Sequence, residues 1–323
     1  MKKNLIFCAV CLCLISGCMA VIVPGAESRK LKEVTLLKDK GYFIEDKILL
    51  IDISGVIRMD SPQGLLSSRT LSPEKIKAIL TKAKADKDIK AILLRVDCPG
   101  GGVTATDVIT HEIKSFAEKK NIPVYAHVLG MAASGGYYVA TAADRIYAEP
   151  TSVTGSIGVI MALSNFEGLA GKVGYKRVVI KSGEMKDIGN AFREMSSDER
   201  KVFQGIIGDM YDRFLETVVK NRSTIADKET LSPLADGRIF TAAQAQKSGL
   251  VDEVGHITKT MADLKKAAGL KKSKLVTYRT DNREHPNFYS PSAMQKNGIL
   301  QIEAPAGWPL DVGGFYYLWS AGK

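Results

Sequence analysis

The stretch that decides the fold reads Gly130-Met131-Ala132-Ala133-Ser134-Gly135-Gly136-Tyr137-Tyr138-Val139-Ala140. A β-branched and aromatic run, residues 122–128, precedes it and an Ala-rich segment comes after it, so the pattern predicts that Ser134 lies where a strand turns into a helix. The neighbouring glycines allow the backbone to approach a substrate closely, and a helix start offers unpaired N–H groups to developing negative charge. Ser134 is therefore a candidate nucleophile. The alternative is a serine that only caps the helix.

Two further turns of small residues come after predicted strands. The strand over residues 89–96 is followed by three glycines, Gly100 to Gly102, and then by a helical pattern. Successive glycines leave backbone N–H groups unshielded, as an oxyanion hole requires, although a plain flexible turn would show the same residues. The other turn, residues 151–158, places Ser156 just past the strand predicted over residues 144–148.

Strands and helices alternate along the chain with short connections. Strands are predicted over residues 47–54, 89–96, 122–128, 144–148, 157–163 and 175–180. Helices are predicted from residues 72, 165, 196, 241 and 257, after the Ser134 turn, and behind the three glycines, where Ile109, Ile113 and Phe116 recur at helical spacing. This alternation predicts an α/β fold with a mostly parallel sheet wrapped by helices. In such sheets ligands collect at the carboxyl ends of the strands, where Gly101, Ser134 and Ser156 all lie.

The longest predicted helix begins with a capping box of Ser196 and Glu199. Five apolar side chains recur along it at helical spacing and are expected to form its buried face: Phe203, Ile206, Met210, Phe214 and Val218.

The first residues differ in kind from the rest of the chain. Residues 1–23 combine Lys2 and Lys3 with a long apolar run, which predicts either a secretory signal or an uncleaved membrane anchor. Ile15-Ser16-Gly17-Cys18 resembles the lipobox of bacterial lipoproteins, in which Cys18 would be lipidated. The lipoprotein and the uncleaved anchor would both tether the chain to the membrane, and the positive charge at the start predicts export of the residues after the leader.

The remaining sequence divides into three parts. A linker is predicted over residues 24–46, one catalytic domain over residues 47–280 and a C-terminal extension over residues 281–323. The extension is loop-like, but its aromatic run, residues 315–319, needs burial against something.

Composition narrows the classes of function. The formal net charge is +10, but the lysines are spread along amphipathic segments, so no nucleic-acid partner is expected. Cys98 is the one cysteine outside the leader, which excludes a disulfide framework in the body. It is expected to be a small buried hydrophobe, with a reactive thiol as the alternative. The four histidines are scattered without metal-ligand spacing, so no metal or cofactor is expected.

Five motifs, taken in order, resemble the bacterial signal peptide peptidase A family. They are Asp97-Cys98-Pro99-Gly100-Gly101-Gly102, the Ser134 stretch, Thr154-Gly155-Ser156-Ile157-Gly158-Val159, Lys186-Asp187 and Gly237-Arg238-Ile239-Phe240-Thr241. The resemblance implies the ClpP and crotonase fold, with repeated β-β-α units, and a Ser–Lys protease. It implies Ser134 as the nucleophile, Lys186 as the general base, Ser156 as the hydroxyl that orients the lysine and Gly101 as the oxyanion N–H.

The length of the chain resembles the single-length form of that family. This form assembles into a homo-oligomer in which Lys186 of one subunit would approach Ser134 of the next. A lysine accepts a proton only when it is neutral, so Lys186 is expected to be buried once the oligomer forms. The alternative is a surface lysine paired with Asp187 or Glu184. No histidine is expected to act as the base.

The expected function is therefore a membrane-tethered serine endopeptidase that degrades remnant signal peptides, which are hydrophobic peptide substrates. Its expected location is the bacterial cell envelope, with the catalytic domain on the extracytoplasmic side. Two alternatives remain: a crotonase-like acyl-processing enzyme, and a catalytically silent oligomeric membrane scaffold.

Overall fold

The computed structural model describes residues 31–60, 70–280, 286–290 and 315–318. Its strands are β1 (Lys32–Lys38), β2 (Lys47–Ser54), β3 (Val56–Ile57), β4 (Thr70–Leu71), β5 (Ile89–Cys98), β6 (Gly100–Gly102), β7 (Val124–Ala133), β8 (Arg145–Ala148), β9 (Val153–Gly155), β10 (Ile160–Met161), β11 (Ile239–Thr241), β12 (Glu253–Val254), β13 (Lys274–Arg279) and β14 (Phe315–Leu318). Its helices are α2 (Pro73–Lys84), α3 (Val103–Lys120), α4 (Gly135–Ala140), α5 (Glu167–Lys172), α6 (Ser197–Asn221), α7 (Lys228–Leu231), α8 (Ala242–Lys247) and α9 (Ile257–Ala267), with the 3-10 helices η1 (Glu184–Asp187) and η2 (Ser232–Leu234).

In the described residues, nine strands form the main sheet. Seven of them have the order β1-β13-β2-β5-β7-β8-β12, and β9 attaches to β7 and carries β11. The pairs from β13 across to β12 are parallel, whereas β1 pairs with β13, and β11 with β9, in antiparallel fashion. This arrangement confirms the predicted α/β fold with a mostly parallel sheet.

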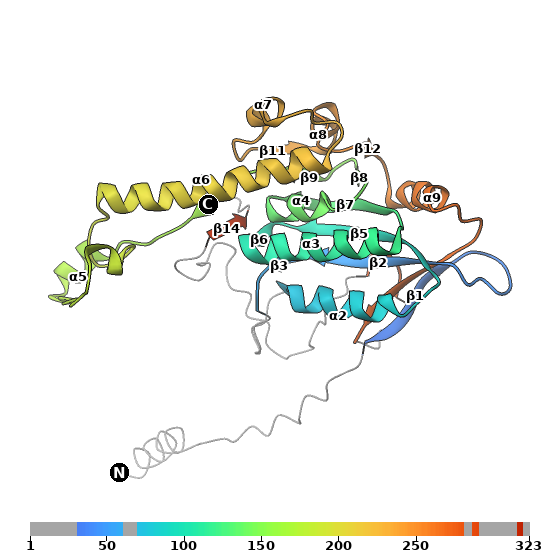
Figure 1. Cartoon of the computed structure of the whole chain (residues 1–323), viewed down its shortest axis with the longest axis horizontal. Helices are drawn as coiled ribbons and strands as arrows, with labels where there is room; N and C mark the ends of the chain where they lie inside the picture. The colour runs from blue at the N-terminus through green and yellow to red at the C-terminus, as the bar shows by residue number, and fades with distance from the viewer. Residues whose placement is uncertain (1–30, 61–69, 281–285, 291–314, 319–323) are drawn as a thin grey trace, which may run out of the picture.

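Strand β2 illustrates why the sheet strands are so apolar. Leu49 and Ile51 belong to an apolar cluster with residues of α2, α3 and α4, whereas Leu50 belongs to a second cluster with Leu264 of α9. Successive side chains of a strand point to opposite faces of its sheet, so a strand that is covered on both faces becomes a continuous apolar run. Figure 1 shows α2, α3 and α4 arranged beside β5 and β7 of this sheet.

Capping residues set the helix starts that the sequence predicted. The Ser72 side chain accepts a 3.3 Å hydrogen bond from the Lys75 amide at the start of α2. At the start of α6, Ser196 and Glu199 form the predicted capping box. The predicted buried face of α6 is confirmed only in the second half of this helix. Phe214 and Val218 are buried there, whereas Phe203 in the first half is half-buried. The first half extends past the sheet toward α5 (Figure 1).

The fold extends beyond residues 47–280 at both ends. Residues 32–38, within the predicted linker, form β1, so the linker prediction is wrong there. At the other end, β14 completes a second sheet with the order β10-β14-β6-β3-β4. Burial of the aromatic run is confirmed for Tyr317, which is 0% exposed.

The strand predicted over residues 175–180 is wrong, because this segment has no regular structure and is exposed. Its β-branched residues have strand character, but a strand needs a neighbour for its backbone hydrogen bonds and the described chain supplies none here. The strand predicted over residues 157–163 is reduced to β10 for a related reason, since only Ile160 and Met161 reach β14. The predicted turn over residues 151–158 contains β9, which pairs with β7.

The predicted leader, residues 1–23, and its candidate lipidation site Cys18 lie outside the described residues. None of the helices within residues 31–60, 70–280, 286–290 and 315–318 combines the length and apolarity that crossing a membrane requires. Cys98 is buried, and burial raises the pKa of its thiol to about 12. This supports the apolar role for Cys98.

Candidate active site

Ser134 lies at the point where β7 ends and α4 begins. Its backbone has φ 52° and ψ −117°, a conformation that residues other than glycine rarely adopt. Such backbone strain costs on the order of 1–3 kcal/mol and is found mainly at functional sites. The Ser134 carbonyl oxygen accepts a 2.9 Å hydrogen bond from the Tyr138 amide, which begins the helix. The expected strand-to-helix junction at Ser134 is therefore confirmed.

Ser156 lies directly beside Ser134. Strands β7 and β9 are parallel neighbours in which Ala133 pairs with Gly155, and each serine comes directly after its paired residue. The Ser134 amide donates a 2.7 Å hydrogen bond to the Gly155 carbonyl oxygen. Ser156 also has a positive φ, 50°, and both side chains are almost fully buried. Two strained serines thus occupy the same edge of the sheet.

The Gly237–Thr241 motif holds the Ser156 turn in place. The Ser156 amide donates a 2.7 Å hydrogen bond to the Arg238 carbonyl oxygen, and β11 pairs with β9. Gly155 has φ 96°, and a Cβ added there would lie 2.7 Å from the Phe240 ring. A glycine is therefore required before Ser156 on both conformational and steric grounds.

The glycines of β6 are held between two other strands. Gly101 pairs with Ile57 of β3 on one side and with Tyr317 of β14 on the other. A Cβ added to Gly101 would lie 2.0 Å from the Ile57 carbonyl oxygen, so no larger residue fits. The structure thus brings β6, Ser134 and Ser156 to one edge, while the oxyanion role of Gly101 stays a prediction.

Gly100 and Gly135 connect β6 to the Ser134 turn. A Cβ added to Gly100 would lie 2.8 Å from the Gly135 amide nitrogen, and one added to Gly135 would lie 3.2 Å from the Gly100 Cα. The Gly135 amide was not predicted as part of the site, although it comes directly after the nucleophile. The available signal was its place as the first residue of α4, where backbone N–H groups lack helical partners.

Lys186 is not brought to Ser134 within one chain. It lies in η1 on the segment between α5 and α6, and it is exposed. Within the described residues, no hydrogen bond or ion pair joins its side chain to Ser134, Ser156 or any carboxylate. Figure 1 shows this region beyond the start of α6, away from α4 and β9.

The carboxylate next to Lys186 pairs with other cations. Asp187 binds the Lys181 ammonium at 2.7 Å and the Arg193 guanidinium at 2.9 Å. The Arg193 hydrogen bonds hold the pKa of Asp187 well below its usual range. Arg193 also pairs with Glu199, the N3 residue of α6, and lowers its pKa to about 2. These pairs tie the Lys186 segment to α6. The alternative of a surface lysine agrees with the exposed position of Lys186, but no ion pair among the described residues joins Lys186 to Asp187 or Glu184.

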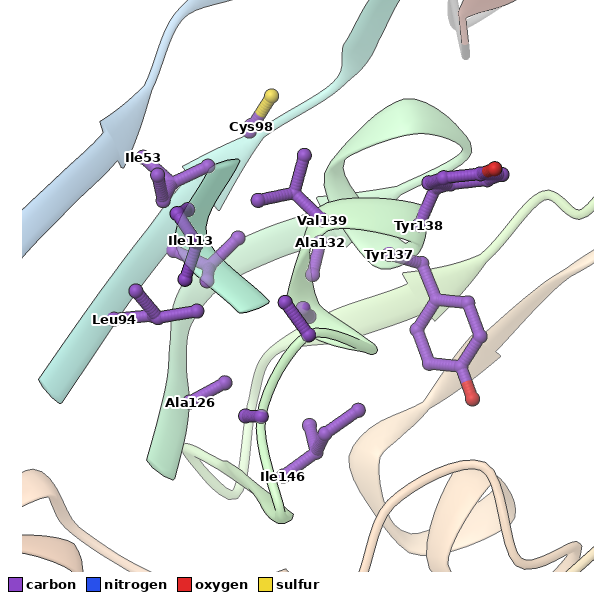
Figure 2. Packing of buried hydrophobic residues seen from close by; sticks show 14 of the residues in the cluster. Ile53, Leu94, Cys98, Ile113, Ala126, Ala132, Tyr137, Tyr138, Val139 and Ile146 are labelled. Atoms are coloured by element: carbon purple, nitrogen blue, oxygen red, sulfur yellow. The ribbon is translucent and has the colours of Figure 1, made fainter. Parts of the chain in front are cut away.

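An aromatic cluster adjoins the Ser134 turn and was not predicted as part of the site. Figure 2 shows the Tyr137 and Tyr138 rings leaving α4 in different directions, while Val139 lies among the core residues near Cys98. The Tyr138 hydroxyl hydrogen-bonds to Asp107 and Thr217, and burial raises its pKa to about 12. The helical spacing of Phe214 predicted its burial but could not show that it contacts the Tyr138 ring.

Within the described residues, no three side chains of His, Cys, Asp or Glu gather so as to bind a metal ion. At this edge of the sheet the structure brings together two serine residues and the backbone amides of the glycine-rich turns.

Two protein-family models match parts of the chain. The model of peptidase family S49 matches residues 117–271, and the Clp protease model matches residues 68–154. The "Putative signal peptide peptidase SppA" of Enterococcus faecium is 32% identical over 286 residues, which cover 84% of this chain and 82% of that protein. Protease 4 of Haemophilus influenzae is 33% identical over 214 residues, 66% of this chain but 34% of that protein. The serine protease SPPA of Arabidopsis thaliana chloroplasts is 34% identical over 234 residues, 72% of this chain and 34% of that protein.

Proposed function

This chain belongs to peptidase family S49, as a serine protease with a ClpP-like fold, and we propose that Ser134 and Lys186 form its catalytic dyad across two subunits. The observation that carries the proposal is the strained Ser134 at the end of β7, paired with the Ser156 turn and packed against the glycines of β6. A strained serine at a strand-to-helix turn, beside glycine backbone amides, is the arrangement that a nucleophile requires.

The base comes from a second copy of the chain. One subunit leaves Lys186 exposed and without a carboxylate partner among the described residues. The surrounding segment exposes large apolar side chains: Phe166, Leu169, Val173, Tyr175, Val178, Ile180 and Met185. Exposed apolar side chains that are concentrated in one segment are typical of an interaction site. Residues 175–180 have no strand partner in the described chain, so they suit a neighbouring subunit. Assembly would bury Lys186 and disfavour its charged form.

The mechanism is acyl transfer to serine. Neutral Lys186 accepts the Ser134 hydroxyl proton while Ser134 Oγ attacks the peptide carbonyl carbon. The Gly101 N–H stabilises the oxyanion, and the Ser156 hydroxyl orients the lysine. Lys186 then gives the proton to the leaving amine, which releases the first product. Water, deprotonated by the same lysine, hydrolyses the acyl-enzyme and regenerates Ser134.

The substrates are remnant signal peptides. Three features support this choice: the name of the Enterococcus relative, the aromatic cluster beside Ser134 and the apolar leader of residues 1–23. A tether at the leader, through Cys18 or as an uncleaved anchor, would hold the catalytic domain on the extracytoplasmic side of the envelope. There it meets apolar peptides that leave the bilayer.

Complementation between two inactive variants tests the shared site. Ser134→Ala and Lys186→Ala are each expected to be inactive, whereas their coexpression should restore about a quarter of wild-type activity, because random neighbours in a closed assembly combine the intact residues in that proportion. Lys87→Ala is the matched control, since Lys87 is an exposed lysine outside the apolar segment. No recovery in the coexpressed sample would place the base and the nucleophile in one subunit.

Fluorophosphonate labelling separates the protease from a silent scaffold. Wild type is expected to be labelled at Ser134, and Ser134→Ala is not. An unlabelled wild-type oligomer that cleaves no peptide would contradict the proposed function and favour the scaffold.

A further inference from the structure

The two strands that lead to Ser134 and Ser156 are paired over a short length. Strand β9 has three residues, and its pairs with β7 are Val153 with Met131, Thr154 with Ala132 and Gly155 with Ala133. The two serines come directly after the last of these pairs. Because the pairing is short, a side-chain bond across it contributes much to the position of one serine relative to the other.

Thr154 makes such a side-chain bond. Its hydroxyl donates a 2.6 Å hydrogen bond to the carbonyl oxygen of Ala132, its partner residue on β7. Thr154 is 0% exposed, and Ala132 belongs to the apolar core (Figure 2). A buried hydroxyl costs free energy unless it is hydrogen-bonded, so this bond is kept as long as the core stays closed.

The position of this bond relates it to both serines. Ala132 lies two residues before Ser134, and Thr154 lies two residues before Ser156. Directly after it, the Ser134 amide donates its 2.7 Å hydrogen bond to the Gly155 carbonyl oxygen. The Thr154 hydroxyl and this amide therefore join β7 to β9 immediately before the two serine turns.

The contacts on the other side of β9 do not replace the Thr154 bond. Strand β11 pairs with β9, and the Ser156 amide donates to the Arg238 carbonyl oxygen. These contacts fix Ser156 relative to β11, but they leave its distance from Ser134 to the junction between β9 and β7. The Thr154 hydroxyl acts at that junction.

A second threonine of the same sheet makes the same kind of bond away from the site. The Thr277 hydroxyl of β13 donates a 2.9 Å hydrogen bond to the Leu50 carbonyl oxygen of β2, and these two strands are also parallel neighbours. Thr277 is 2% exposed, so the two threonines are equally buried. The strands that Thr277 joins carry neither serine, which makes it a matched reference for Thr154.

We propose that Thr154 is a positioning residue of the active site, whose hydroxyl fixes the Ser134 turn relative to the Ser156 turn through Ala132. The inference rests on the proposed function, in which Ser134 attacks the substrate and Ser156 orients the base. Both roles depend on the separation of the two serines, and a displacement of about 1 Å is enough to slow catalysis strongly. Loss of the Thr154 hydroxyl is therefore expected to lower kcat and to leave KM nearly unchanged.

Two comparisons at position 154 isolate the effect of the hydroxyl. Thr154→Val replaces the hydroxyl with a methyl group, whereas Thr154→Ser and Thr154→Ala both lack the methyl group and differ only in the hydroxyl. With the full chain in detergent and an apolar peptide as substrate, kcat should fall roughly tenfold to a hundredfold in the valine and alanine variants. The serine variant should keep most of the wild-type kcat. Equal kcat in the serine and alanine variants would overturn the inference, even if the valine variant fails to fold.

Thr277→Val is the control for stability. Urea unfolding should give similar losses of stability in Thr154→Val and Thr277→Val, because each substitution leaves one buried carbonyl oxygen without its hydroxyl donor. We expect kcat to fall only in Thr154→Val. Equal kcat in the two valine variants would show that Thr154 contributes to stability alone.

The rate of fluorophosphonate labelling gives a readout that needs no peptide binding. Labelling of Ser134 should be slower in Thr154→Val than in wild type, and close to the wild-type rate in Thr154→Ser and Thr277→Val. An unchanged labelling rate in Thr154→Val would overturn the inference and leave the protease intact. A wild-type enzyme that is not labelled and cleaves no peptide would overturn the proposed function and this inference with it.

Discussion

The Ser134 amide donates a 2.7 Å hydrogen bond to the Gly155 carbonyl oxygen, so Ser134 and Ser156 leave the ends of two paired strands side by side. Both serines have positive φ values, 52° and 50°. The parallel pairing of β7 with β9 therefore places Ser134 and Ser156 next to each other. The backbone strain at the two serines arises because both strands turn at the same edge of the sheet.

Replacing the strained nucleophile should separate stability from activity. Ser134→Gly relieves the positive φ, whereas Ser134→Ala keeps it, so we expect the glycine variant to be about 1 kcal/mol more stable than the alanine variant. Both should be inactive. Urea unfolding measures the free-energy difference, and equal midpoints for the two variants would argue that the backbone at Ser134 is relaxed in solution.

A charge in the exposed apolar segment should disrupt assembly. Ile180 is 98% exposed in one subunit, so Ile180→Asp should leave the thermal unfolding of the subunit unchanged. We expect this variant to lose oligomer mass by light scattering and to fall roughly a hundredfold or more in activity, because an unpaired charge would be buried at the interface. Tyr42→Asp, equally exposed but outside this segment, is the control. An Ile180→Asp protein that remains oligomeric and active would exclude the segment from the interface.

Acid should destabilise the protein through His127. Burial lowers the pKa of His127, whose ring contacts Thr260 Oγ1 at 2.7 Å and a Glu149 carboxylate oxygen at 3.1 Å. The unfolded state, with a pKa of about 6.5, then binds more protons than the folded state below that pH. Stability contributed by His127 is therefore present above about pH 6.5 and is lost as the pH falls, by up to about 1.4 kcal/mol per pH unit.

His127→Gln tests this linkage, because glutamine cannot be protonated in this range. Urea unfolding at pH 7.5, 6.5 and 5.5 should give a shallower loss of stability for the variant than for wild type. If the free energy of unfolding fell equally with pH in wild type and in the variant, His127 would not contribute to the acid destabilisation.

Strand β14 should compete with substrates. It pairs with β6 beside the Ser134 turn, and we expect an extended peptide substrate to pair with the same strand edge. Substrate binding would then displace β14, so the apparent affinity would fall with the fraction of open sites. Tyr317→Ala removes the buried ring, and we expect the KM for short peptides to fall roughly tenfold with kcat nearly unchanged. Tyr316→Ala, on the same strand but only half-buried, should change KM less. A higher KM together with lower stability in Tyr317→Ala would instead make β14 a purely structural strand.

Local patterns in the sequence were sufficient to predict most of the helices and strands of the central fold. The Ser72 cap, the Ser196–Glu199 capping box and the strand over residues 47–54 depend on neighbouring residues, and the structure confirms all three. The junction at Ser134 was predictable for the same reason, since glycine spacing and an apolar run before it are local signals. The family was recognisable from five such motifs in order.

Pairing between distant segments was decided only by the tertiary structure. Strand β1 forms because β13 lies beside it, Tyr317 is buried because β14 enters between β6 and β10, and residues 175–180 stay irregular because the described chain offers them no neighbour. By itself, the sequence identified Ser134, Gly101 and Ser156 as candidate site residues and predicted the strand end at Ser134. Tertiary structure placed these residues together and kept Lys186 apart, because backbone hydrogen bonding and packing act between segments that no local pattern relates.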